Sequence, residues 1–107
     1  MTDARMMLTT AGSREEAEKI ANALVQRELA ACVNIVGPIG SVYRWKGKVE
    51  SATEFLLIIK TTEDAFDPVR RAVQELHSYE LPEFVEIGIT RGDGKYLSWL
   101  EKCVHFE

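Results

Sequence analysis

The sequence has little of several features that would each indicate a particular class of protein. Only 3 of its 107 residues are proline and 46% are hydrophobic, which is typical of a folded globular domain. All of its apolar runs are shorter than the ~18 residues that a membrane-spanning helix requires. The 13 basic and 17 acidic residues give a net charge of −4, whereas a nucleic-acid surface needs an excess of lysine and arginine. We therefore expect no membrane and no nucleic acid among its partners.

Cysteine is scarce as well. The two thiols, Cys32 and Cys103, are too few and too far apart in the sequence to form a disulfide framework. The first residues lack the basic stretch and the apolar segment of a secretory signal. Both observations predict a cytoplasmic protein. A chain of this length can bury one hydrophobic core but not two, so we expect a single domain over residues 1–107.

The hydrophobic pattern predicts an α+β domain. Its strands and helices are expected in the order strand 5–10, helix 14–29, hairpin 31–61, helix 63–76, strand 84–89, and a last helix after residue 94. The order β-α-β-β-α-β is that of the ferredoxin-like sandwich, here with a long central hairpin and an extra C-terminal helix.

Some details of these elements can also be predicted. Ser13 fits the N-cap of the first helix, with Glu16 reaching back to complete a capping box. Pro68 belongs in the first turn of the second helix, for which Thr62, Asp64 and Asp67 are alternative caps. The run at 55–59 is apolar without alternation, as in a central strand covered on both faces. The last helix is expected to turn four side chains inward: Tyr96, Trp99, Leu100 and Cys103.

The hairpin is too long for the body that we expect. Arms of about 14 residues extend some 45 Å at about 3.3 Å per residue. A compact domain of this length has a radius of gyration of roughly 13 Å. The distal part would therefore overhang the core and contact other chains, which predicts a homo-oligomer. The alternative is that a break at 37–40 folds the hairpin back and makes Tyr43 and Trp45 ordinary core residues.

Four blocks of the sequence resemble the CutA family of divalent-cation tolerance proteins. They lie in the family's order and spacing at Leu29–Ile35, Ser41–Glu50, Ile59–Thr61 and His77–Glu83. The resemblance implies a ferredoxin-like subunit and a tight homotrimer in which extended strands link neighbours. It also implies a role in tolerance of copper and other divalent cations. Because no reaction is assigned to the members of this family, we expect a binding protein and not an enzyme.

The protein is not expected to need the metal ion in order to fold. Three residues are candidates to bind the ion. His77 is the first, because a neutral imidazole binds copper and zinc well. Glu80 and Cys32 are the others, with copies from neighbouring subunits completing the three or four ligands of a tight site. The alternatives are that His77 caps a helix C-terminus and that Cys32 is a small buried hydrophobe.

A second candidate site takes an anion in place of a metal. Lys60 supplies a positive charge at the end of a buried strand, and Glu50 and Tyr79 would join it in a polar cleft between subunits. Such a cleft would bind a small anionic metabolite. The same residues could instead form an ion pair at the subunit interface, in a protein that serves only as a structural scaffold.

Overall fold

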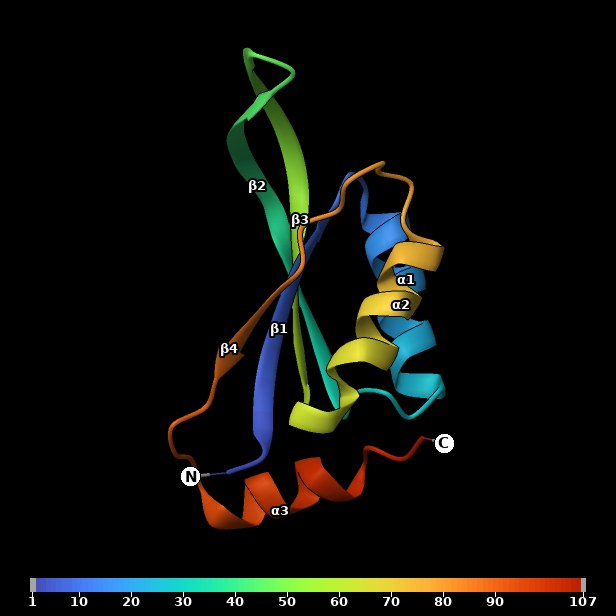
Figure 1. Ribbon diagram of the computed structural model, residues 1–107, viewed down its shortest axis with the longest axis vertical. Coiled ribbons are helices and arrows are strands. Elements are labelled where there is room, and N and C mark those ends of the chain that lie inside the picture. Colours follow the sequence, from blue (N-terminus) through green and yellow to red (C-terminus); the bar gives the residue numbers. More distant parts are fainter. Residues whose placement is uncertain (1, 107) are drawn as a thin grey trace.

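The computed structural model describes residues 2–106. Its four strands form one antiparallel sheet in the order β2-β3-β1-β4. The two longer helices pack on one face of the sheet, and a third crosses one end of it (Figure 1). In chain order the elements are β1 (Ala4–Ala11), α1 (Arg14–Gln26), β2 (Cys32–Trp45), β3 (Lys48–Thr62), α2 (Phe66–Leu76), β4 (Val85–Gly88) and α3 (Gly94–Lys102). This arrangement confirms the α+β, ferredoxin-like prediction.

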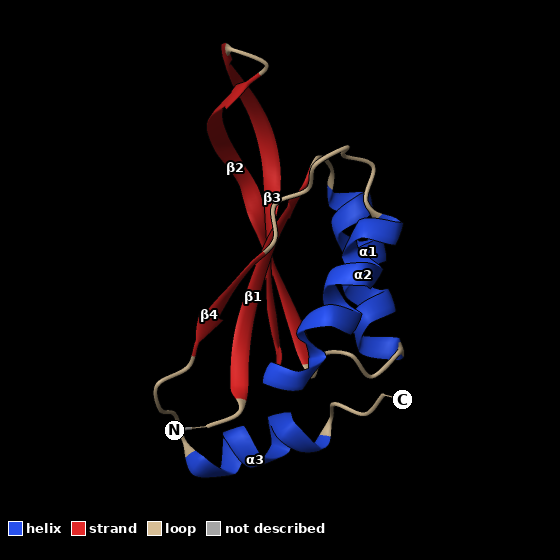
Figure 2. Ribbon diagram, viewed as in Figure 1, coloured by secondary structure: helices blue, strands red, loops and turns tan. Residues whose placement is uncertain are grey.

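The hydrophobic core lies between the sheet and the helices α1 and α2 (Figure 2). Alternate residues of the central strands point into it, so that Met7 on β1 lies opposite Ile59 on β3 and both are fully buried. Fully buried aliphatic side chains from the two helices complete the layer: Ile20, Leu24, Val69 and Val73. Among the described residues, no helix is long and apolar enough to cross a bilayer.

In the part of the chain that the structure describes, no layer of helices lies over the opposite face of the sheet (Figure 1). Leu8 on β1 is paired with Ile58 on β3 and with Val85 on β4, so these three side chains share that face. Leu8 and Ile58 are half-buried, and Val85 is 46% exposed. The run at 55–59 therefore lies in a central strand, as predicted, but within a single chain only one of its two faces is covered. The aliphatic surface that remains is referred to below as the open face.

The hairpin of β2 and β3 extends well beyond the sheet and gives the molecule a length of 44 Å against a width of 26 Å (Figure 1). Lys46 and Gly47 at its tip both have positive φ, as a two-residue turn between twisted strands requires. The register between the arms shifts between Val36 and Ile39, which places a β-bulge at the interruption expected at 37–40. Because pairing resumes after the bulge, the overhang is confirmed and the folded-back alternative is wrong.

A side chain has no room at Gly37, beside this bulge. A Cβ there would lie 2.5 Å from Cδ2 of Phe55 and 3.1 Å from the carbonyl oxygen of Glu54. We expect Gly37→Ala to lower the free energy of unfolding by about 1–3 kcal/mol, as overpacking does in other proteins. Urea denaturation measures this loss. Gly40→Ala is the matched control, since a Cβ at Gly40 meets nothing within 4 Å. Equal losses in the two variants would contradict the prediction.

Helix boundaries differ from those predicted. The helix α1 ends three residues earlier than expected, because Glu28 takes a positive φ and the amides of Leu29 and Ala30 turn back to the Leu24 carbonyl. A 3-10 turn at Glu63–Ala65 precedes α2. The N-cap of α2 itself is Ala65, whereas the predicted candidate Thr62 is the N-cap of the 3-10 turn, and neither makes a side-chain cap.

Strand β4 and helix α3 also differ from the prediction. The strand is shorter than expected, with all four of its residues exposed. On α3 only Leu100 is buried. Trp99 is 47% exposed and Tyr96 is 42% exposed, which corrects their predicted inward orientation.

Candidate functional site

The segment that follows α2 is held in place by His77. This residue is the C-cap of α2, and its side chain is completely buried. Its Nε2 atom lies 2.6 Å from the carbonyl oxygen of Thr10, which can only accept, so Nε2 carries a proton. Its Nδ1 atom lies 3.1 Å from the backbone nitrogen of Tyr79 and 3.2 Å from Oε1 of Glu16. Both ring nitrogens therefore have protein partners, and a metal ion could bind His77 only by displacing one of them.

Glu16 links the start of α1 to the same segment. Ser13 Oγ accepts from the backbone nitrogen of Glu16 at 3.1 Å, which confirms one half of the predicted capping box. The Glu16 carboxylate does not complete the box. It accepts instead from the backbone nitrogen of Ser78 at 2.9 Å and from its hydroxyl at 2.7 Å. Burial by itself would raise the pKa of Glu16, but the hydrogen bonds from the backbone and hydroxyl of Ser78, together with the electrostatic effect of the neighbouring His77 and Lys19, outweigh it and lower the pKa.

Tyr79 points from this segment toward the hairpin. Its hydroxyl donates to Oε2 of Glu54 at 2.8 Å, and Glu54 is only 7% exposed. Gly12 leaves the space that the phenol needs, because a Cβ there would come within 3.1 Å of the Tyr79 oxygen. Burial and the hydrogen bond and charge of Glu54 raise the pKa of Tyr79 well above its usual value. The phenol therefore stays protonated and remains a donor to Glu54.

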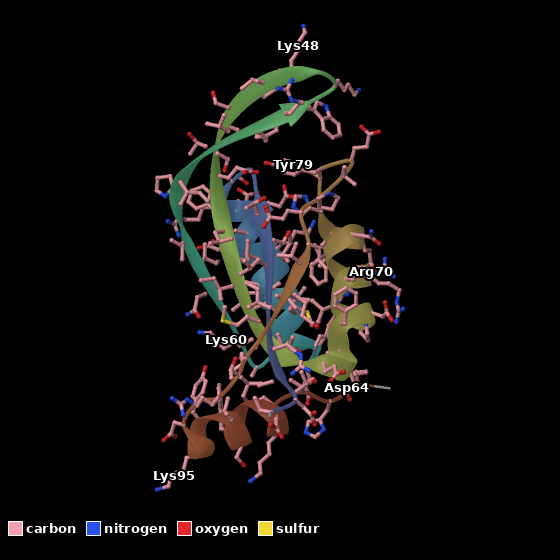
Figure 3. The ribbon with its side chains drawn as sticks, turned by 60° about the vertical axis from the view of Figure 1, so that its left-hand side comes forward. Lys48, Lys60, Asp64, Arg70, Tyr79 and Lys95 are labelled. Atoms are coloured by element: carbon pink, nitrogen blue, oxygen red, sulfur yellow. The ribbon has the colours of Figure 1, made fainter. Side chains whose placement is uncertain are left out.

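A cleft opens between the distal hairpin and the segment 79–83, beside the labelled Tyr79 in Figure 3. Its volume is about 760 Å³, and the described residues that line it include Glu54, Glu80 and Glu83 but no lysine or arginine. The remaining lining residues are mostly aromatic or aliphatic: Thr10, Ser41, Val42, Tyr43, Trp45, Tyr79, Leu81 and Pro82. The cleft therefore favours a positively charged ligand with apolar parts.

The residues predicted to bind an anion are separated within one chain. Lys60 lies on the open face, pairs with Cys32 across the strands and donates to the side-chain oxygen of Asn34. Glu50 lies near the hairpin tip. Tyr79 lies in the cleft, away from Lys60 (Figure 3). An anion site built from these three residues requires more than one chain and stays a prediction.

The predicted metal ligands are also apart. His77 is buried on the helical side of the sheet, Cys32 is half-buried on the open face, and Glu80 is exposed at the cleft. Cys32 Sγ has a weak contact of 3.8 Å with Asn34. Within residues 2–106, no three His, Cys, Asp or Glu residues are placed to hold a metal ion together. One chain by itself does not form the predicted site.

Two carboxylates of this region were missed from the sequence. Glu54 directly precedes the apolar run of β3, and a charged residue beside buried positions was a usable signal. Glu16 was read only as a local capping residue, since nothing in the sequence indicates its bonds to Ser78, 62 residues away.

Comparison with known proteins places these features in a family. A family model described as CutA1 divalent ion tolerance protein matches residues 5–103. The chain is 46% identical over 97 residues to the divalent-cation tolerance protein CutA of Thermus thermophilus, covering 91% of this chain and 94% of that protein. It is 48% identical over 96 residues to the chloroplastic protein CutA of Arabidopsis thaliana. That match covers 90% of this chain but 53% of the plant protein, so the chain spans about half of its length.

Solved structures agree with this comparison. The divalent cation tolerance protein CutA1 from Thermus thermophilus has a TM-score of 0.93 at 44% identity, over 95% of this chain and 99% of that one. CutA1 from Oryza sativa has a TM-score of 0.95 at 38% identity, over 99% of this chain and 97% of that one.

Proposed function

Because this chain belongs to the CutA1 divalent ion tolerance family, we propose that it acts in divalent-metal homeostasis as a non-enzymatic homotrimer with metal sites between its subunits. Copper is the metal to test first, and the cytoplasm is the compartment that we assign to it. The observation that carries the proposal is the open face, an aliphatic surface of the sheet that no helix within residues 2–106 covers.

The open face supports self-association for a thermodynamic reason. Burying apolar surface contributes roughly 25 cal/mol per Å², and this face presents aliphatic side chains on three adjacent strands. The hairpin supports it for a geometric reason. Strand β2 is an edge strand of 14 residues, and its distal part carries Val42 at 75% and Trp45 at 37% exposure. A long edge of this kind pairs readily with another chain.

The metal site of this proposal needs more than one subunit. His77, Glu80 and Cys32 supply the chemistry that copper and zinc prefer, but a single chain keeps them apart. Copies from neighbours would complete three or four ligands. Anionic metabolites are the rival ligand, with Lys60 as the charge partner. The lining of the cleft in one chain is acidic and does not favour an anion, so an anion site would need Lys60 from a neighbouring subunit.

Calorimetric titration with Cu²⁺ tests the proposal. The wild-type assembly is expected to bind Cu²⁺, and Glu80→Gln and Cys32→Ser are each expected to weaken binding by at least about tenfold. Glu18→Gln, which changes an exposed carboxylate on α1, is the control and should leave binding unchanged. No heat of Cu²⁺ binding to the wild type, or equal affinities in all variants, would reject the metal site. A parallel titration with small dicarboxylates and phosphate tests the rival.

A further inference from the structure

The four-stranded body ends and the two-stranded overhang begins at one place in the sheet. Pairing of β1 with β3 stops at Phe55, and the bulge of β2 between Val36 and Ile39 lies opposite this residue. Beyond it, within residues 2–106, the two arms of the hairpin pair with each other alone. A ribbon of two strands is marginally stable by itself, so its direction depends on what holds its base. We call Phe55 and residues 36–39 the hairpin base.

The side chain of Arg14, the first residue of α1, contacts both strands of the hairpin base. Its guanidinium carbon lies 4.9 Å from the centroid of the Phe55 ring on β3. Its Nη2 atom donates to the carbonyl oxygen of Gly37 on β2 at 3.4 Å. We propose that Arg14 is a clamp that sets the direction of the overhanging hairpin relative to the body of the subunit.

The place of Arg14 in its helix supports a role outside that helix. The helix macrodipole favours acidic side chains in the first turn, where Glu15 and Glu16 lie, and it disfavours a positive charge there. The contacts with the hairpin base give a reason for an arginine at this position. A planar guanidinium can stack on an aromatic ring and donate a hydrogen bond at the same time, which a lysine ammonium does less well.

The hairpin base is packed closely enough to act as one unit. A Cβ on Gly37 would lie 2.5 Å from the Phe55 ring, so the bulge and the ring are already in contact. Pro38 has no amide hydrogen and cannot donate to the ladder at this point. Side-chain contacts must therefore supply the rigidity that the interrupted ladder lacks. A guanidinium that binds the ring and the carbonyl together restrains β2 and β3 at once.

A second contact holds the hairpin from its other face, directly beside the base. Glu54 precedes the aromatic residue of the base on β3, so the two side chains point to opposite faces, and Glu54 accepts from the Tyr79 hydroxyl at 2.8 Å. The segment that carries Tyr79 is bound to Glu16 through the backbone nitrogen of Ser78. Both contacts therefore originate in the first turn of α1, directly through Arg14 and indirectly through Glu16.

The direction of the hairpin has a consequence for assembly, and this consequence rests on the homotrimer proposed above. Contacts between copies close into a ring only when each chain meets the next at one fixed rotation. An overhang that already points in the required direction loses less entropy when the chains associate. Arg14 is therefore a positioning residue for the assembly, and it acts through the hairpin without having to touch another chain.

Distance measurements in a single chain test the clamp itself. Nitroxide labels at positions 48 and 70 report the separation between the distal hairpin and α2 by pulsed electron paramagnetic resonance, with both native cysteines replaced by serine (Figure 3). The measurement uses the variant Ile58→Asp, whose charge on the open face should keep the chains apart. Arg14→Ala should broaden the distribution of distances. Glu15→Ala, which truncates an exposed neighbour in the same turn, is the control and should leave it unchanged.

Sedimentation of the assembled protein tests the consequence. Arg14→Ala should raise the concentration at which half of the chains are assembled by about tenfold, the factor that corresponds to losing a contact of this kind. In a Phe55→Leu background the same substitution should have a much smaller effect, because the ring that the guanidinium contacts is absent.

The outcomes separate the clamp from the homotrimer. An unchanged distribution of distances in Arg14→Ala would overturn the clamp, as would an equal effect of Arg14→Ala with and without the Phe55 ring. A broader distribution together with unchanged association would overturn the positioning role. A wild type with the mass of one chain would reject the homotrimer, and the distance measurement, which needs one chain only, would still decide whether Arg14 holds the hairpin.

Discussion

Replacing Ile58 by aspartate is expected to separate the assembly into single chains. Ile58 lies in the middle of the open face, opposite Leu8 on β1 and Asn34 on β2. In a single chain this position is half-exposed, so the aspartate keeps much of its hydration. In the proposed homotrimer the same carboxylate would be buried in every subunit. Burial of an unpaired charge costs about several kcal/mol per ion, and each 1.4 kcal/mol changes a dissociation constant by about tenfold.

Light scattering at micromolar concentration checks this expectation. The wild type should have three times the mass of one 12.1 kDa chain, and Ile58→Asp should have the mass of a single chain. Val25→Asp is the matched control, because Val25 is an aliphatic residue of α1 that is 42% exposed on the helical side. It should keep the wild-type mass. A threefold mass for Ile58→Asp, or a single-chain mass for the wild type, would rule out assembly through the open face.

The second large effect is expected from His77→Ala. The substitution empties a completely buried position and removes the partners of the Thr10 carbonyl and of the Tyr79 amide. Each buried polar group left without a partner costs about 1–3 kcal/mol, and the cavity adds to this. We therefore expect the free energy of unfolding to fall by about 3 kcal/mol or more. The Tyr79 phenol should also lose its fixed position beside Glu54.

Urea denaturation at a fixed protein concentration measures the change, since association makes apparent stability depend on concentration. His105→Ala is the control, because His105 is an exposed histidine near the other end of the chain. An exposed substitution of that kind usually changes stability by less than about 0.5 kcal/mol. If His77→Ala lost no more than His105→Ala, the anchoring role assigned to His77 would be wrong.

Much of the fold followed from local pattern in the sequence. The order of the elements was predictable because strand and helix periodicities are clear in each segment and one order of elements fits them. The overhanging hairpin was predictable because strand length follows directly from residue number. The C-terminal end of α1 and the turn before α2 were missed, since they depend on the positive φ of Glu28 and on a cap without a side-chain bond. Neither leaves a clear mark in the sequence.

The candidate site was harder to predict than the fold. The sequence indicated that the stretch from His77 to Glu83 is important for function. In the structure, residues 79–83 of this stretch form one wall of the cleft. The sequence did not indicate which side chains meet. Lys60 and Tyr79 were grouped by residue type, yet the strand geometry separates them. Glu54 was overlooked because its partner, Tyr79, is 25 residues away and belongs to a loop.

The long sequence separation of the bonds around His77 has a consequence for how this protein matures. His77 reaches Thr10 across 67 positions, and Ser78 reaches Glu16 across 62. Contacts between residues so far apart in the sequence can form only after the first strand, both long helices and the loop have come together. A nascent or partly unfolded polypeptide therefore has no cleft. Any ligand of that cleft would recognise only the finished tertiary structure and would select it over every earlier intermediate.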